Sequence, residues 1–61
     1  NRIISGVTDF YIKRVEHFNI YATQGEISYF IACYDSYKDA CREVENIFNA
    51  LKNGEEYYCV G

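Results

Sequence analysis

Hydrophobic and polar residues alternate in the first half of this chain, and the second half changes to a helical spacing. Over residues 9–15, Phe10 and Ile12 point to one side, whereas Tyr11 and Lys13 point to the other. This two-residue period is that of a β-strand with one buried face. The pattern therefore predicts a first strand over about 9–15.

A second strand is predicted over about 18–23, where Phe18, Ile20 and Ala22 alternate with more polar positions. The two polar residues before this strand are expected to form its connection to the first one. The two strands together predict an antiparallel hairpin with one apolar face.

A third strand is predicted over about 26–34, after a tight turn at Gln24-Gly25, where glycine supplies the positive φ that two-residue hairpin loops need. This strand is apolar on both faces, which is typical of a central position in a sheet. A short fourth strand is expected over about 57–60. The apolar positions of residues 1–8 either add an edge strand or dock against the sheet.

One amphipathic helix is predicted over residues 36–53, and both of its ends are marked in the sequence. Ser36 is a good N-cap, and Asp39 follows at the capping-box spacing, with its carboxylate near the positive end of the helix. Gly54 follows the last turn, where a left-handed residue closes many helices. The apolar stripe consists of Ala40, Val44, Ile47, Phe48 and Leu51. Six polar residues mostly occupy the opposite, wet side: Lys38, Arg42, Glu43, Glu45, Asn46 and Asn49.

Together these elements predict a single small α+β domain over residues 1–61. Its small, mainly antiparallel sheet, in β-β-β-α-β order, is covered on one face by the helix. The helix is expected on the face that carries Phe10, Ile12, Phe18 and Ile20. The opposite face remains open to solvent, and the function of the protein is expected there.

The open face is expected to display Tyr11, Lys13 and Tyr21, with Phe30 or Tyr29 according to the register of the third strand. Tyrosine buries a large ring at low entropic cost and keeps a polar hydroxyl, so interfaces favour it. Two other interpretations stay open: β-rich segments favour aromatic residues in any case, and nucleobases stack on exposed rings. The candidate contact residues are Tyr11, Lys13, Tyr21, Phe30 and Tyr58.

The composition adds that apolar surface is in excess. Of 61 residues, 49% are apolar and 18% aromatic, which is more than the core of so small a domain requires. We therefore expect the protein to bind a copy of itself, as a dimer or a larger assembly, or to bind another protein. The runner-up function is a small-ligand site formed between subunits.

The net charge of −3 comes from residues 31–61, and no basic cluster accompanies it. Nucleic acid and anionic membranes both require positive charge on the protein, so neither is an expected partner. The longest apolar run, residues 29–34, is far too short to cross a membrane. No signal-peptide pattern is present, although the chain opens at Asn1 rather than Met, so upstream residues can be missing.

The three cysteines, Cys33, Cys41 and Cys59, are odd in number and widely spaced, unlike a disulfide framework or a zinc site. We expect them to be reduced and buried as small apolar groups, in a cytoplasmic protein. His17 has no cysteine partner that the sequence identifies, and the carboxylate pairs lie on solvated segments. We therefore expect no catalytic residue, no metal and no cofactor, and a protein that is not an enzyme.

The second half of the chain carries a pattern that also occurs in other small proteins. Ser36 and Ala40 form an S-x-x-x-A helix start, Ile47, Ala50, Leu51 and Gly54 form an I-x-x-A-L-x-x-G helix end, and the aromatic pair Tyr57 and Tyr58 follows. On these positions residues 29–60 resemble small uncharacterised proteins of Firmicutes and their phages. The resemblance implies an inhibitor or modulator of a host protein such as a defence system, a class that includes anti-CRISPR proteins.

The same stretch is similar to the SPOR peptidoglycan-binding repeat, on Tyr34, Ser36 and Ala40, which fit its strand end and helix start. A SPOR domain contains two such β-α units and lies outside the membrane, whereas one helix is predicted here. This second resemblance implies a glycan binder, and it is ranked below the first.

Overall fold

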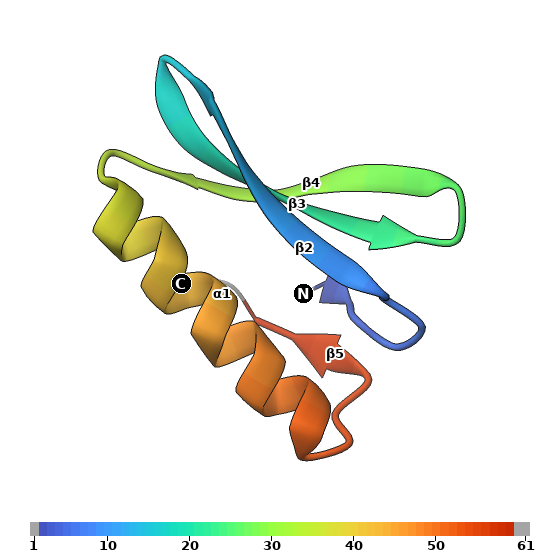
Figure 1. Ribbon diagram of the computed structural model, residues 1–61. Helices are drawn as coiled ribbons and strands as arrows, with labels where there is room; N and C mark the ends of the chain where they lie inside the picture. Colours follow the sequence, from blue (N-terminus) through green and yellow to red (C-terminus); the bar gives the residue numbers. More distant parts are fainter. Residues whose placement is uncertain (1, 60–61) are drawn as a thin grey trace.

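Three strands form one antiparallel sheet, and the helix crosses one of its faces (Figure 1). The computed structural model describes residues 2–59, and its main sheet has the order β2 (Asp9–Val15), β3 (His17–Gln24) and β4 (Ile27–Tyr34). The helix α1 (Tyr37–Lys52) follows β4, and a second antiparallel sheet pairs β1 (Arg2–Ile3) with β5 (Tyr57–Tyr58). The predicted α+β fold is confirmed, with the last strand placed in the second sheet.

The helix begins and ends where the sequence marks it. The Oγ of Ser36 accepts a hydrogen bond from the backbone N–H of Asp39 over 3.1 Å. Within residues 2–59 the Asp39 carboxylate does not return a capping-box bond to Ser36; its Oδ1 lies 3.7 Å from Nη1 of Arg42 instead. At the other end Gly54 has a φ of +78°, and its N–H donates to the carbonyl of Leu51. The predicted bounds of 36–53 are therefore those of the helix with its caps.

The alternation along β2 and β3 separates the two faces of the sheet as predicted. Phe10 lies opposite Ala22, and Ile12 lies opposite Ile20, on the side that the helix covers. Buried side chains from all three long strands and the helix form one core with the first residues of the chain. Its members are Ile4, Phe10, Ile20, Ala22, Ile31, Ala32, Ala40, Ile47 and Ala50.

The central strand of the sheet is β3, so the predicted central position of the third strand is wrong. The register shifts along β4, because Ala32 pairs with Ile20 whereas Phe30 pairs with Tyr21. Ile31 is the extra residue of this β-bulge, and Ile31 and Ala32 are both buried. The two-sided apolar pattern of β4 therefore reflects a bulge in an edge strand.

Two tight turns connect the long strands. Gly25 and Glu26 join β3 to β4, one residue later than predicted, and Gly25 has a φ of +64°. Between β2 and β3, Glu16 alone separates the paired residues Val15 and His17. Glu16 has a φ of +65°, a backbone conformation that residues other than glycine rarely adopt, so this hairpin tip stores backbone strain.

The N-terminal residues complete the core beside the helix. Ile4 is fully buried, and its backbone N–H donates to the carbonyl of Glu56 over 2.8 Å. The hydroxyl of Tyr29 donates to the carbonyl of Ile3 over 2.8 Å, which ties β4 to β1. This segment therefore both pairs as a short strand and docks into the core. Val60, the last residue of the predicted fourth strand, lies outside the described residues.

Candidate protein-interaction face

Three aromatic rings lie side by side on the face of the sheet that the helix leaves uncovered. Tyr11 of β2 and Tyr21 of β3 stack with their ring centroids 5.2 Å apart and their planes at 15°. Tyr21 also meets Phe30 of β4 edge to face, with the centroids 6.0 Å apart. Tyr11 and Phe30 are 41% and 42% exposed. We call these three residues the aromatic ladder, because their rings cross all three strands and Tyr21 contacts both of the others.

The register of β4 decides which aromatic residue joins this ladder. Phe30 pairs with Tyr21 and lies on the open face, whereas Tyr29 pairs with the buried Ala22 and lies on the helix side. Lys13 is exposed on the same open face as the ladder. Four of the five candidate contact residues therefore share one surface: Tyr11, Lys13, Tyr21 and Phe30.

Tyr58, the fifth candidate, lies apart from the aromatic ladder and contacts the helix. Its hydroxyl donates to Oε1 of Glu43, and the hydroxyl of Tyr34 donates to Oε2 of the same carboxylate. Glu43 is buried, so its predicted place on the wet side of the helix is wrong. The two phenol hydroxyls satisfy the carboxylate, which offsets part of the cost of removing it from water. We call Tyr34, Glu43 and Tyr58 the Glu43 cluster.

Helical spacing alone indicates that Glu43 belongs to the buried stripe. It lies three residues after Ala40 and four before Ile47, which are both fully buried, so its side chain shares their face of the helix. The charge of Glu43 favours the solvated side of the helix, but its position in the helix favours the buried side. An acidic residue inside an apolar stripe, in a chain rich in tyrosine, is the pattern that predicts such a cluster.

Burial and the neighbouring carboxylate keep both hydroxyls of the Glu43 cluster in their neutral form. Desolvation raises the pKa of Tyr58 to about 12, and the hydrogen bond and negative charge of Glu43 act in the same direction. The same causes raise the pKa of Tyr34. Both hydroxyls therefore remain hydrogen-bond donors at neutral pH.

The Glu43 cluster makes stability sensitive to alkaline pH. The folded pKa of Tyr58, about 12, exceeds the value of about 10 for an unfolded tyrosine, so the folded state binds more protons between these limits. The free energy of unfolding should therefore fall as the pH rises through this range. Below this range the protonated Tyr58 hydroxyl makes its full contribution to stability. In urea unfolding followed across pH, Tyr58→Phe should flatten the fall, whereas Tyr57→Phe, at the exposed neighbouring position, should not. Equal slopes for both variants would contradict this prediction.

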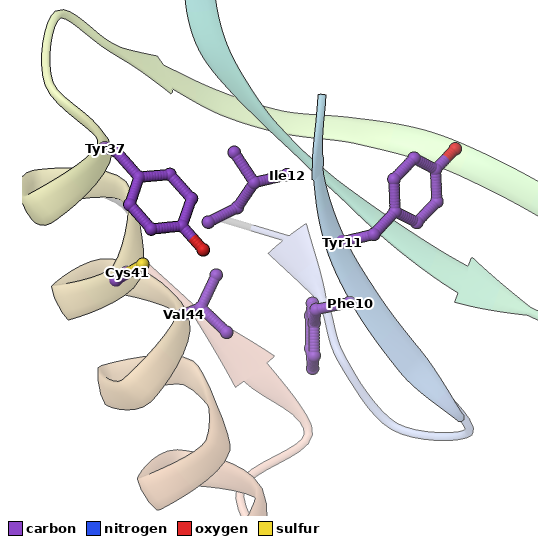
Figure 2. A pocket seen from close by; sticks show the side chains of 6 residues that line it. All are labelled: Phe10, Tyr11, Ile12, Tyr37, Cys41 and Val44. Carbon is purple, nitrogen blue, oxygen red and sulfur yellow. The ribbon is translucent and has the colours of Figure 1, made fainter. Parts of the chain in front are cut away.

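A shallow apolar groove runs between β2 and α1 (Figure 2). Residues 10–12 line it from the strand, Tyr37, Cys41 and Val44 line it from the helix, and its volume is about 330 Å³. In Figure 2 the side chains of Phe10 and Ile12 lie between β2 and the three helix residues, whereas the Tyr11 side chain points away on the other side of β2. A second hollow, of about 360 Å³, is lined by Tyr34, Asp39, Arg42, Glu43 and Asn46. The flank of the helix beside β2 is therefore the more apolar one, and the other flank carries charged and amide side chains.

The cysteines are not the buried group that the sequence predicts. Cys33 and Cys59 are exposed, and Cys41 is half-buried in the groove. Cys33 lies between Ala32 and Tyr34, which both face the helix, so the strand alternation directs its thiol to the open face. Within residues 2–59, no three His, Cys, Asp or Glu side chains gather closely enough to hold a metal ion.

No protein-family model, curated protein or solved structure is significantly similar to this chain. In the part of the chain that the structure describes, no helix has the length and apolar character needed to span a lipid bilayer.

Proposed function

We propose that the protein is a non-enzymatic binding module whose aromatic ladder, with Lys13 beside it, occupies a surface of a protein partner. The observation that carries this proposal is the ladder itself, in which the ring of Tyr21 contacts those of Tyr11 and Phe30 on an uncovered sheet face. Protein interfaces are enriched in aromatic residues, because a rigid ring buries much area at little entropic cost. Contiguous exposed apolar patches on small proteins often mark such interfaces.

Charge favours a protein over a nucleic acid as the partner. The chain carries a net charge of −3, and Lys13 is the one Lys or Arg on the open face of the described three-stranded sheet. Arg14 lies on the helix side, where its guanidinium carbon is 5.6 Å from the centroid of the Phe18 ring. Faces that stack nucleobases flank their aromatic rings with cations that neutralise phosphates, so this face fits a protein surface better.

The geometry of the open face also favours binding over catalysis. The imidazole Nδ1 of His17 lies 3.1 Å from Oδ1 of Asp35, but both side chains are largely exposed at the end of the sheet. General acid–base catalysis relies on enclosed groups whose pKa values are shifted by their surroundings. The solvent-exposed pair of His17 and Asp35 is therefore better suited to contact a partner than to catalyse a reaction.

The partner that we propose is a host protein of the kind that phage-type or mobile-element proteins inhibit, such as a component of a defence system. This part of the proposal is supported by the resemblance of residues 29–60 to small phage-type proteins. A cytoplasmic location belongs to the same proposal, and the free cysteines Cys33, Cys41 and Cys59 suit a reducing compartment.

Removal of two rings of the aromatic ladder should strongly reduce partner capture without unfolding the protein. In Tyr21→Ala/Phe30→Ala, we expect the captured partner to fall by about tenfold or more, because each central interface aromatic contributes roughly 2 kcal/mol. The measurement is quantitative mass spectrometry of proteins retained by the tagged chain from the cells that produce it. Tyr57→Ala is the matched control, since it removes an exposed ring outside the ladder. A partner retained equally by the wild type and the double variant would contradict the assignment of this face.

The apolar groove favours a second candidate function, the binding of a small apolar ligand. Its volume of about 330 Å³ lies at the lower end of the range for ligand pockets. Phe10, Ile12 and Val44 supply apolar walls, and the Tyr37 hydroxyl supplies a polar group. A rise in melting temperature with a small molecule, lost in Val44→Asp, would favour this function over the first.

A further inference from the structure

The apolar side of α1 is wider than the sheet can cover. Ala40, Ile47 and Ala50 face the sheet and are buried. A second stripe lies beside β2 at the spacing i, i+4, i+7 and i+11, and it consists of Tyr37, Cys41, Val44 and Phe48. Although Tyr37 packs against Phe18 and Phe48 against Phe10, these two rings remain 57% and 44% exposed. The β2 flank of the molecule is therefore an incompletely covered apolar surface.

The strand next to this stripe is a free edge of the sheet. β2 pairs with β3 on one side, and no strand within residues 2–59 pairs with its other side. The outward N–H and C=O groups of an edge strand are available to a further strand. Phe10 and Ile12 extend from β2 into the groove (Figure 2). A strand added to β2 would therefore both extend the sheet and close the groove.

The sequence of β2 is complementary to itself in one antiparallel register. Asp9 and Lys13 lie at equal distances on either side of Tyr11, and all three are exposed on the open face. When two copies pair about Tyr11, Asp9 of each copy lies opposite Lys13 of the other, and Phe10 lies opposite Ile12 on the groove side. Opposite charges directly across a strand pair are stabilising, and like charges are destabilising.

We propose that this edge is the interface of a symmetric homodimer, in which β2 pairs antiparallel with β2 of a second copy, centred on Tyr11. The two three-stranded sheets become one continuous sheet of six strands, with both helices on the same face. The exposed parts of Tyr37 and Phe48 face the second copy across the closed groove. A two-fold axis brings the same patch of both copies together, so the assembly closes as a dimer and leaves no such patch free for a third copy.

Other edges and registers fit a second copy less well. β4 carries the bulge at Ile31, which interrupts a regular hydrogen-bond ladder, and the hollow bordered by Tyr34 carries the charged side chains of Asp39 and Arg42. On β2 itself, centring the pair on Ile12 removes the opposition of Asp9 and Lys13. Centring it on Lys13 places two lysines opposite each other.

The dimer deepens the proposed function, and its use in partner binding rests on that function. The Tyr11 rings of the two copies lie next to each other at the axis, so two aromatic ladders join into one open face. The self-association contact is the strand edge and the groove, which leaves Tyr21 and Phe30 available to a partner.

Charge inversion tests this interface without changing the core, because Asp9 and Lys13 are both exposed. The wild type should sediment as a dimer, and Lys13→Asp or Asp9→Lys alone should raise the dimer dissociation constant by about tenfold or more, because both charge pairs become repulsive. An equimolar mixture of the two variants should form a heterodimer in native mass spectrometry, since every cross-strand pair is again opposite in charge. Lys38→Asp, on the exposed side of the helix, makes the same change in net charge as Lys13→Asp and should leave the dimer intact.

A wild type that stays monomeric across the micromolar to millimolar range would overturn the proposal. Single variants that dimerise as tightly as the wild type would overturn it too, as would a mixture with no preference for the heterodimer. Heterodimer formation also shows that both variants are folded, so a misfolded variant cannot imitate the expected result. Tyr21→Ala/Phe30→Ala separates the two proposals: it should remain dimeric while losing the partner, whereas a monomeric wild type that still captures a partner would overturn the dimer alone.

Discussion

The Glu43→Ala variant is expected to lose about 2–4 kcal/mol of its free energy of unfolding, because the change removes the acceptor of two charge-assisted hydrogen bonds. Tyr34 from β4 and Tyr58 from β5 both donate to this carboxylate, so one side chain joins the helix to two separate sheets. A domain of 61 residues has only about 3–9 kcal/mol in total. Urea unfolding followed by circular dichroism should therefore show a large loss of the folded state.

Two further substitutions show whether the hydrogen bonds cause this loss. Glu43→Gln keeps the shape of the side chain and one carbonyl oxygen but removes the charge, so it should lie between the wild type and Glu43→Ala. Glu45→Ala removes an exposed carboxylate from the same helix and should change the free energy of unfolding by less than about 0.5 kcal/mol. A Glu43→Ala variant as stable as Glu45→Ala would mean that the cluster contributes nothing to the fold.

The Ile4→Ala variant should lose about 2–5 kcal/mol, the usual cost of deleting a fully buried isoleucine side chain down to its Cβ. Ile4 has no exposed surface, and its backbone N–H is held by the carbonyl of Glu56. The side chain therefore fixes the first residues of the chain against the helix, the sheet and β5. Differential scanning calorimetry should show a melting temperature many degrees below that of the wild type.

The neighbouring residue provides a matched control for this prediction. The side chain of Ile3 is 54% exposed, so Ile3→Ala removes the same atoms from a more solvated position and should cost less than about 1 kcal/mol. Equal losses from Ile3→Ala and Ile4→Ala would contradict the burial of Ile4. A small loss from both would show that the N-terminal segment is not part of the folded core.

Elements set by local chemistry could be predicted from the sequence. The helix could be bounded because Ser36 and Gly54 satisfy its ends through short-range hydrogen bonds and backbone conformation. The covered face of the sheet could be predicted because the alternation along β2 and β3 is uninterrupted. The same alternation predicts that Tyr11, Lys13 and Tyr21 share the open face, and the pairing of β2 with β3 places them there.

Features that depend on distant partners could not be predicted in the same way. The alternation rule assumes that no residue is inserted, and the bulge at Ile31 breaks that assumption, so an edge strand resembled a central one. Helical spacing favours a buried Glu43, but the two hydroxyls that meet its carboxylate come from β4 and β5, so local pattern does not predict that Tyr58 contacts the helix. Ile3 and Ile4 are identical in type, and only the pairing of β1 with β5 determines which of them is buried.

The bulge in β4 also bears on how far this protein can aggregate. β4 is an eight-residue strand with no charged side chain, and it lies at a sheet edge, a combination that favours runaway addition of strands and fibril growth. The extra residue at Ile31 bends the strand and breaks the regular spacing of its outward hydrogen-bonding groups. An irregular strand is a poor template for a further strand, so the bulge should limit polymerisation at this edge, as charged residues do at many other sheet edges.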